Sequence, residues 1–242
     1  MYIEKIFDLV RKEEVVLWVG SGFSKYAGYP VGDELSKILY DNLSKPEKKA
    51  NNKLENLSLP DLSEEFVRLK LDSRTTLNTI LQNIFLKAPK SLKFHELISN
   101  IPHIQSIITT NYDNSFELAY KESAIKITSQ NDIAYIDGKI EIFKVHGDLK
   151  NFESIIITKS DYAKFFFNNE QSNLFWTTVI ERISNKVIVF IGYGFEDDNI
   201  KNIIEKISQI LKTDRKEIFL IAPKYPPQKV AHLNQKGIQY ID

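Results

Sequence analysis

Four apolar segments of this chain each end in a cluster of polar residues or glycines. The segments are Val15–Val19, 104–108, 140–145 and Val187–Ile191. A continuous apolar run of this length is typical of a strand that is buried on both faces of a parallel sheet. In an open parallel sheet, ligands bind in the crevice outside the carboxyl ends of the strands. If the four strands share one sheet, the four clusters therefore face one cleft.

Helical patterns alternate with these strands along the chain. Helices are expected at 3–12, from near Phe23, after a cap at Asp33, and at 62–71, 76–86, 95–100, 114–121, 161–167, 172–184 and 199–211. Further short strands are expected at 125–128, 134–136, 155–158, 217–221 and 238–241, with Asp137 and Gly138 forming a hairpin turn before the strand at 140–145. This alternation predicts an α/β fold, a Rossmann-like doubly wound sheet that is mostly parallel.

The stretch from about 33 to 103 is mostly helical and shows no strand pattern. Residues 41–60 are polar and contain Pro46 and Pro60, which favours a loop there. We therefore predict a single domain over 1–242 with a helical insertion at about 33–103 between the first two strands.

Charge and cysteine content exclude several classes of protein. The 32 basic and 32 acidic residues balance, so no basic field attracts nucleic acid or an acidic membrane surface. The chain has no cysteine, which excludes disulfides and thiolate zinc sites. The N-terminal residues lack the apolar core of a signal peptide, and no apolar run is long enough to span a bilayer. A cytoplasmic protein without direct nucleic-acid contact is expected.

The first cluster, Gly20, Ser21 and Gly22, lies at a turn from strand to helix. Glycine lets the backbone approach a phosphate closely, and a helix N-terminus presents N–H groups to an anion. The third glycine of the dinucleotide fingerprint is replaced by Lys25, and no P-loop lysine follows. A tight turn without a ligand is the alternative interpretation.

The second and third clusters supply side chains that could do chemistry. Asn111 could hold a ribose hydroxyl or orient a water, because its amide both donates and accepts hydrogen bonds. Asp113 or Asn114 could instead cap the following helix. His146 directly follows an apolar strand, and a neutral imidazole is the usual general base near neutral pH. A histidine that is merely hydrogen-bonded beside a turn is the alternative.

The fourth cluster contains Gly192 and Gly194, followed by the acidic run 196–198 and Asn199. Paired glycines again permit close backbone approach. The acidic run is expected to charge and cap the next helix rather than to bind a metal, and Asp198 or Asn199 could also contact a ribose.

Taken in order, these segments resemble the sirtuin-like superfamily, and in particular its zinc-free bacterial branch, which serves as the effector of anti-phage defence systems. The matching residues are Gly20 to Ser24, then Gly28, Tyr29 and Pro30, then Thr109 to Asp113, then His146 to Asp148, then Thr158 and Tyr162, and finally Gly192 to Asn199. The chain lacks the four-cysteine zinc module of sirtuin deacylases, and Val31, Gly32 and Asp33 stand where deacylases have Asp-Phe-Arg.

The resemblance implies an NAD+ hydrolase that cleaves the nicotinamide–ribose bond without a metal. It implies that Asn111 positions the ribose and the attacking water and that His146 accepts a proton. It implies NAD contacts from Gly20, Ser21, Gly22, Ser24, Asp113, Gly192, Gly194 and Asn199.

Two other functions stay open from the sequence. One is a non-catalytic module that senses NAD or ADP-ribose, and the other is a protein-lysine deacylase, which the missing zinc module disfavours. The resemblance also implies that a homo-oligomer or a sensor partner gates activity, with the helical stretch 33–103 as the expected assembly surface.

Overall fold

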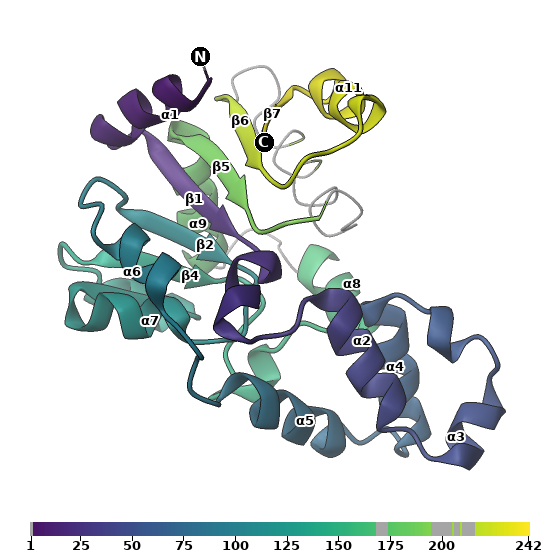
Figure 1. Cartoon of the computed structure of the whole chain (residues 1–242). Helices are drawn as coiled ribbons and strands as arrows, with labels where there is room; N and C mark the ends of the chain where they lie inside the picture. Colours follow the sequence, from purple (N-terminus) through teal and green to yellow (C-terminus); the bar gives the residue numbers. More distant parts are fainter. Residues whose placement is uncertain (1, 168–173, 195–204, 206–208, 210–215) are drawn as a thin grey trace.

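The computed structural model describes residues 2–167, 174–194, 205, 209 and 216–242 (Figure 1). Its centre is a sheet of seven strands. The strands are β1 (Val15–Val19), β2 (Ser106–Thr109), β3 (Ala124–Ile127), β4 (Ile140–Lys144), β5 (Val187–Ile191), β6 (Ile218–Ile221) and β7 (Ile238–Ile241).

The strand order is β3-β4-β2-β1-β5-β6-β7, and every pair is parallel. Leu17 in the middle of β1 pairs with Ile107 of β2 on one side and with Val189 of β5 on the other. The chain builds the β2 side first and then crosses to the β5 side, so the winding direction reverses between β1 and β5. The predicted doubly wound α/β fold is confirmed, and such a reversal is where ligand crevices form.

Helices cover both faces of the sheet, which is why its strands are continuous apolar runs. One face is packed by α1 (Tyr2–Arg11), α6 (Lys93–Ser99) and α7 (Ser115–Tyr120). The other face is packed by α9 (Leu174–Asn185) and α11 (Pro227–Gln235).

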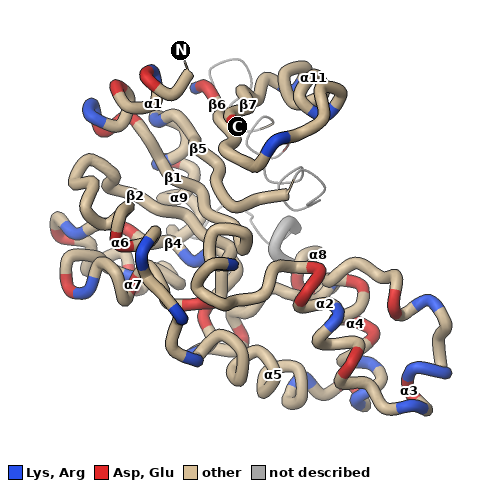
Figure 2. Tube along the Cα trace, in the orientation of Figure 1, with Lys and Arg blue, Asp and Glu red and all other residues tan. Residues whose placement is uncertain are grey.

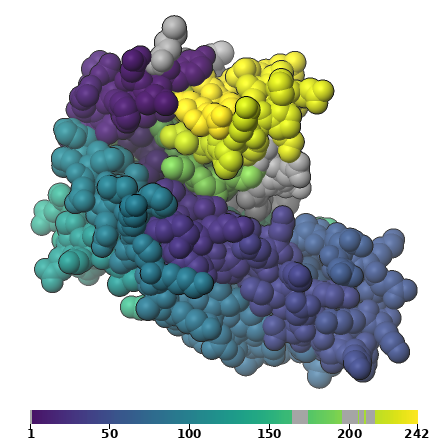
Figure 3. All heavy atoms as spheres, viewed as in Figure 1, coloured from purple at the N-terminus to yellow at the C-terminus, as the bar shows by residue number. Residues whose placement is uncertain are grey.

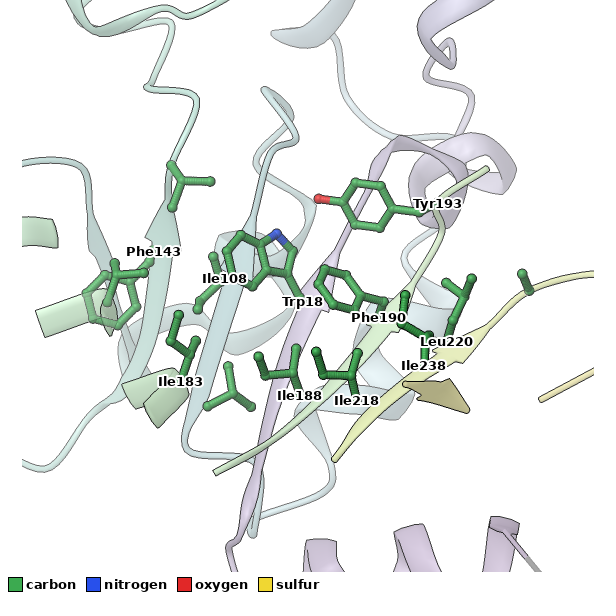
Figure 4. Packing of buried hydrophobic residues seen from close by; sticks show 14 of the residues in the cluster. Trp18, Ile108, Phe143, Ile183, Ile188, Phe190, Tyr193, Ile218, Leu220 and Ile238 are labelled. Atoms are coloured by element: carbon green, nitrogen blue, oxygen red, sulfur yellow. The ribbon is translucent and has the colours of Figure 1, made fainter. Parts of the chain in front are cut away.

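The core under α9 shows how these side chains interlock (Figure 4). The rings of Trp18 on β1 and Phe190 on β5 stack with centroids 5.5 Å apart. Ile183 of α9 packs in the same cluster as Ile108 of β2 and Phe143 of β4. Burying a large apolar side chain contributes about 1.5–3 kcal/mol to the free energy of unfolding. The core between α9 and the sheet therefore holds in place the strands whose ends carry the polar clusters.

A second body of helices lies between β1 and β2 in the sequence and extends away from the sheet (Figures 1 and 3). It contains the 3₁₀ helix η1 (Ser21–Ala27), α2 (Gly32–Asp41), α3 (Lys45–Ala50), η2 (Leu54–Asn56), α4 (Leu59–Leu69) and α5 (Thr75–Phe85). Apart from α3, these helices share their own hydrophobic cluster, to which Leu39, Phe66 and Leu81 belong. We call this body the helical layer.

The loop predicted for 41–60 is wrong, because two helices begin within it. Ser44 accepts the N–H of Glu47, and the Glu47 carboxylate accepts the N–H of Ser44, which caps α3. Ser58 likewise caps α4 by accepting the N–H of Asp61. Pro46 and Pro60 lie in the first turns, where proline is tolerated because its missing N–H has no partner there.

Other boundaries also differ from expectation. The predicted cap at Asp33 is wrong: Val31 is the N-cap of α2, and its N–H donates to Glu34. The predicted hairpin at Asp137 and Gly138 is wrong as well, because residues Gln130–Tyr135 form the 3₁₀ helix η4 and β3 pairs with β4 in parallel. The helix α11, which follows Pro226, was not expected from the sequence.

The predicted strand at 155–158 is not formed. The carboxylate of Asp161 accepts the N–H groups of Ile157 and Thr158 instead, and this cap begins α8 (Lys159–Phe167). The remaining 3₁₀ turns are η3 (Lys121–Ser123) and η5 (Phe152–Ser154). The helix predicted at 199–211 lies outside the described residues.

Acidic and basic residues are interspersed over much of the described chain (Figure 2). In α3, for example, Lys45, Lys48 and Lys49 flank Glu47. None of the helices that the structure describes combines the length and hydropathy needed to cross a membrane.

Candidate functional site

A pocket opens where the carboxyl ends of β1, β2 and β4 meet the helical layer. Its cavity measures about 80 Å³, well above the roughly 10–15 Å³ that one water occupies on this measure. The polar part of its lining comes from η1 and from the loops after β2 and β4, and it consists of Ser21, Ser24, Thr110, Asn111, Asp113 and His146. The apolar part comes mainly from the helical layer and includes Tyr29, Pro30, Val31, Leu35, Leu59, Phe85, Tyr112 and Tyr162.

Asn111 is held in one orientation by the first glycine turn. Its side-chain Nδ2 donates to the Gly20 carbonyl and to Ser24 Oγ, both at 3.1 Å. Its backbone N–H donates to Thr109 Oγ1 at 3.0 Å. Among the described residues, Asn111 Oδ1 is buried without a hydrogen-bond partner. The amide is therefore a fixed acceptor in the pocket lining.

His146 follows β4 and is buried in the same lining, with only 4% of its surface exposed. Burial lowers the pKa of its imidazole to about 3, because the charged form is poorly solvated there. The ring meets that of Tyr162 edge to face, with centroids 5.3 Å apart. His146 is therefore a neutral imidazole near neutral pH.

The turn after His146 requires glycine at position 147. Gly147 has φ +84°, and a Cβ there would lie 2.1 Å from the Ser154 carbonyl oxygen. The Ile156 N–H donates to the His146 carbonyl at 3.1 Å. The chain thus folds back on itself directly beyond the imidazole and holds the His146 backbone in place.

Asp113 bonds the start of the following helix, as the alternative interpretation predicted, and it also lines the pocket. Its Oδ1 accepts the N–H of Ser115 at 3.0 Å, in the first turn of α7. The side chain is buried, so the capping carboxylate lies inside the site.

Gly20 and Gly22 of the first cluster pack against Gly192 of the fourth rather than lining the pocket. Gly22 N–H donates to the Gly192 carbonyl at 2.8 Å, and Gly20 N–H donates to Ile191 at 2.9 Å. A Cβ on Gly192 would lie 2.4 Å from the Phe23 nitrogen. Close approach is thus needed here between two turns of the chain. Gly194 is exposed, with nothing within 4 Å of a Cβ placed on it, and Asn199 lies outside the described residues.

Charged groups surround the third cluster. Asp148 forms an ion pair with Lys126 of β3. Burial opposes ionisation of Asp148, but the hydrogen bond from Lys126 and the charge of Lys144 lower its pKa overall. The carboxylate is therefore a structural anion beside His146 rather than a proton donor.

Four hydrogen bonds tie the start of α8 to the helical layer. Arg74, at the N-terminus of α5, donates to both oxygens of Asp161, at 2.7 and 2.8 Å. Glu64 of α4 accepts from the N–H and hydroxyl of Ser160. Tyr162, which follows Asp161 in α8, contacts the ring of His146. The helical layer is thus linked to the site through α8.

Two buried groups near the site were missed in the sequence. His95 has no exposed surface, contacts Tyr26 OH at 2.7 Å through Nδ1, and packs between the rings of Phe23 and Phe116. Burial lowers the pKa of His95 to about 4, against the opposing charge of Asp113. Lys144, the last residue of β4, is also fully buried. No local pattern marks either one, because each is defined by contacts with distant segments.

In the part of the chain that the structure describes, no group of three or more His, Asp or Glu side chains is arranged to hold a metal ion. The chemistry available at the pocket is therefore that of a fixed amide acceptor, a neutral imidazole, two serine hydroxyls and a capping carboxylate, beside an apolar wall.

The fold and the pocket define a doubly wound α/β protein with a site at the carboxyl ends of its parallel strands. A family model described as "SIR2-like domain" matches residues 105–241. The chain belongs to this SIR2-like family.

Comparison with individual proteins finds relatives of greater length. The chain is 25% identical over 228 residues to "NAD(+) hydrolase ThsA" from Enterococcus faecium, covering 92% of this chain and 46% of that protein. It is 28% identical over 252 residues to "Defense-associated sirtuin 2" from Bacillus subtilis, covering 99% of this chain and 24% of that protein. The chain thus spans less than half the length of these two curated relatives.

Among solved structures, a match is "Sir2-p53 peptide-NAD+". Its TM-score is 0.46 and its sequence identity is 14%, with 99% of this chain and 92% of that chain covered.

Proposed function

We propose that this chain hydrolyses NAD+ at the nicotinamide–ribose bond and acts as an effector domain in bacterial antiviral defence. Membership of the SIR2-like family and similarity to proteins named NAD(+) hydrolase and defense-associated sirtuin support the proposal. The relatives' names supply the reaction, and the pocket supplies residues suited to it.

The observation that carries the proposal is the Asn111 amide. Two donated hydrogen bonds leave Oδ1 as a buried acceptor without a partner among the described residues. A buried acceptor without a partner is costly. A ribose hydroxyl or an ordered water would satisfy it, and both belong to a reaction in which water attacks a ribose carbon.

The reaction needs orientation more than strong acid or base. The bond from ribose C1′ to the nicotinamide nitrogen breaks, and its electron pair neutralises the cationic ring. Water attacks C1′ and loses one proton, which gives ADP-ribose, nicotinamide and H⁺. The barrier is lowered mainly by holding ribose and water in line and by stabilising the developing positive charge.

We assign Asn111 and His146 as the catalytic residues. Asn111 Oδ1 orients the ribose or the water. His146, neutral because of its burial, accepts the hydrogen bond of the ribose hydroxyl or of the attacking water as the proton leaves. Asp113 would contact the nicotinamide side.

At the first glycine turn, Ser21 and Ser24 would contact the pyrophosphate through their hydroxyls. The N–H groups of Gly20 and Gly22 already donate to the turn after β5. Those two glycines, with Gly192, would therefore support the NAD site by packing two turns together behind the residues that contact NAD. Gly194 and Asn199 would line the adenosine side.

The proposal extends to the organisation of the protein. Residues 1–242 would form one NAD-binding domain with a helical insertion at about 33–103, working in the cytoplasm. Activity would be gated by self-association or by a partner that senses infection, because unchecked loss of NAD+ kills the host.

The test is release of nicotinamide. Purified chain is incubated with NAD+ at several protein concentrations, and nicotinamide and ADP-ribose are separated by chromatography. Asn111→Ala and His146→Ala are expected to lower turnover by about 10²-fold or more, since positioning and proton-transfer groups contribute that much. Each variant should retain the helix content of the parent protein.

Matched controls are Asn185→Ala, whose side chain bonds the α9 backbone, and His103→Ala, which lies outside the pocket lining. Both should turn over NAD+ like the parent chain. Binding of NAD+ without cleavage at any protein concentration would instead indicate a sensor module. NAD+ cleavage that requires an added acyl-lysine peptide would indicate a deacylase.

A further inference from the structure

Lys144 is a charged residue in the interior of the sheet. It is the last residue of β4, where it pairs with Thr109 of β2, and its side chain has no exposed surface. Side chains alternate across a strand, so Lys144 points to the same face as Ile142, under α7. An apolar side chain would fill this position without the cost of burying a charge.

The ammonium group lies among four oxygens. Lys144 Nζ donates to the carbonyls of Tyr112 at 3.1 Å and Asp113 at 2.8 Å, and to Asn114 Oδ1 at 3.2 Å. It lies 3.3 Å from the carboxylate of Glu117 in α7. Three of the four oxygens belong to consecutive residues, so one side chain fixes the path of the loop between β2 and α7.

That loop carries the proposed ribose-binding amide. Asn111 directly precedes the fixed residues, and Thr110, Asn111, Tyr112 and Asp113 all line the pocket. The side chain of Asn111 is tied to Gly20 and Ser24 from the pocket side. Lys144 is not part of the lining and holds the backbone from the sheet side.

We infer that Lys144 is a positioning residue that holds the 110–114 loop so that the Asn111 amide and the Asp113 carboxylate face the ligand. The inference rests on the proposed function for its catalytic consequence. Lys144 touches no ligand and acts through the loop alone. The end of β4 therefore supplies the lysine that holds the loop, and the turn directly after β4 supplies the imidazole of His146.

The test replaces the ammonium with an apolar side chain of similar length, Lys144→Met, in the full chain. Without NAD+, amide hydrogen exchange of residues 110–116 should become at least about tenfold faster. Exchange of β5 and β6 should become faster only by the amount that the loss in overall unfolding free energy explains. With NAD+, kcat should fall by about 10²-fold with a smaller change in KM, because a loop displaced by about 1 Å loses alignment.

Two other variants separate positioning from plain structural support. Glu117→Gln removes the carboxylate charge and keeps the three loop contacts, so it should leave exchange at 110–114 unchanged. Lys70→Met removes another ion-paired lysine, the partner of Glu47 in the helical layer, and should leave both the loop and kcat unchanged. If Lys144→Met and Glu117→Gln lower stability alike and neither accelerates exchange of the loop, the inference is overturned.

Lys144→Gln covers the case in which the methionine variant does not fold. Its shorter side chain keeps two N–H donors. Hydrogen exchange of the loop should therefore be faster than in the parent chain, and kcat should be lower than in the parent but still measurable. Parental values of both the exchange rate and kcat would overturn the inference. If the parent chain releases no nicotinamide at all, the proposed function fails, whereas the exchange experiment still decides the role of Lys144.

Discussion

The carbonyl of Gly192 accepts the N–H of Gly22 at 2.8 Å, although 169 residues separate the two glycines in the sequence. The contact joins the turn after β5 to the turn after β1, at the point where the winding of the sheet reverses. Neither glycine lines the pocket. Their small size serves the close packing of two turns, and this packing places Ser24 where it can hold Asn111.

Gly192→Ala should therefore destabilise the protein strongly. A Cβ at this position would lie 2.4 Å from the Phe23 nitrogen, and φ is +77°. Left-handed strain alone costs about 1–2 kcal/mol, and overpacking adds about 1–3 kcal/mol. Urea denaturation measures the free energy of unfolding.

Gly138→Ala is the matched control for that change. Gly138 has φ +71°, and nothing lies within 4 Å of a Cβ placed on it. It should show only the cost of backbone strain, about 1–2 kcal/mol. Equal losses in the two variants would contradict the close packing of the glycine turns.

The two buried histidines should make the fold sensitive to mild acid. Their pKa values, about 3 for His146 and about 4 for His95, lie below the ordinary 6.5 because burial disfavours the charged ring. The unfolded chain binds more protons below pH 6.5, so the stabilisation is fully present above 6.5 and is lost as pH falls toward 4. The slope reaches about 1.4 kcal/mol per pH unit for each histidine.

Denaturation in urea at pH 7.5, 6.5 and 5.5 measures this effect. His95→Phe should reduce the slope of unfolding free energy against pH by the contribution of up to one proton. Phenylalanine would occupy the space between the rings of Phe23 and Phe116 without titrating. Unfolding free energies that stay constant from pH 7.5 to 5.5 would show that the imidazoles are solvated.

The rate of NAD+ cleavage should not follow a histidine titration near neutral pH. His146 is already neutral, since burial lowers its pKa to about 3. The value of kcat/KM, which reports on groups of the free enzyme, should be flat from pH 5.5 to 7.5 where the protein remains folded. An acid limb centred near 6.5 would mean that the imidazole titrates in contact with water.

Arg74→Met should weaken the link between the helical layer and the pocket. The guanidinium donates twice to Asp161, whose side chain is 13% exposed, and once to the Ile155 carbonyl at 3.3 Å. Losing hydrogen bonds to a charged partner costs about 1.5–3 kcal/mol. Denaturation and nicotinamide release should both report the loss, because Asp161 precedes Tyr162 at the site.

Arg11→Met provides the comparison for Arg74. Its ion pair with Asp8 is exposed, with side-chain exposures of 70% and 65%, and such pairs contribute about 0–1 kcal/mol. Similar effects for the two arginines would contradict a special role for the Arg74 contact.

The sequence predicted the sheet well because its strands are continuous apolar runs. Val15–Val19, Val187–Ile191 and Ile238–Ile241 begin and end where expected. The apolar run at 134–136 misled, because Asp132 accepts hydrogen bonds from Thr128 and Ser129 and winds this stretch into a 3₁₀ turn. Parallel neighbours such as β3 and β4 also need a longer connection than a hairpin supplies.

The pocket was harder to foresee than the sheet. The strand ends that carry Asn111 and His146 follow from the topology, whereas the apolar wall comes from helices far away in sequence. Phe85 showed only helical periodicity, and Leu59 was predicted to lie in a loop. Lys144 lay within the segment 140–145 that was predicted as an apolar strand, and the partners that allow its burial come from a loop after another strand. Such roles arise from tertiary contacts that no local pattern encodes.

The apolar wall of the pocket belongs to the core of the helical layer, and part of its polar lining follows the strands of the sheet. A molecule bound there touches residues of the helical layer and residues carried by the sheet, so part of its binding free energy holds these two bodies together. With a ligand bound, the two bodies would unfold as one cooperative unit. Without a ligand, α8 and the contact of Arg74 with Asp161 would set the orientation of one body relative to the other.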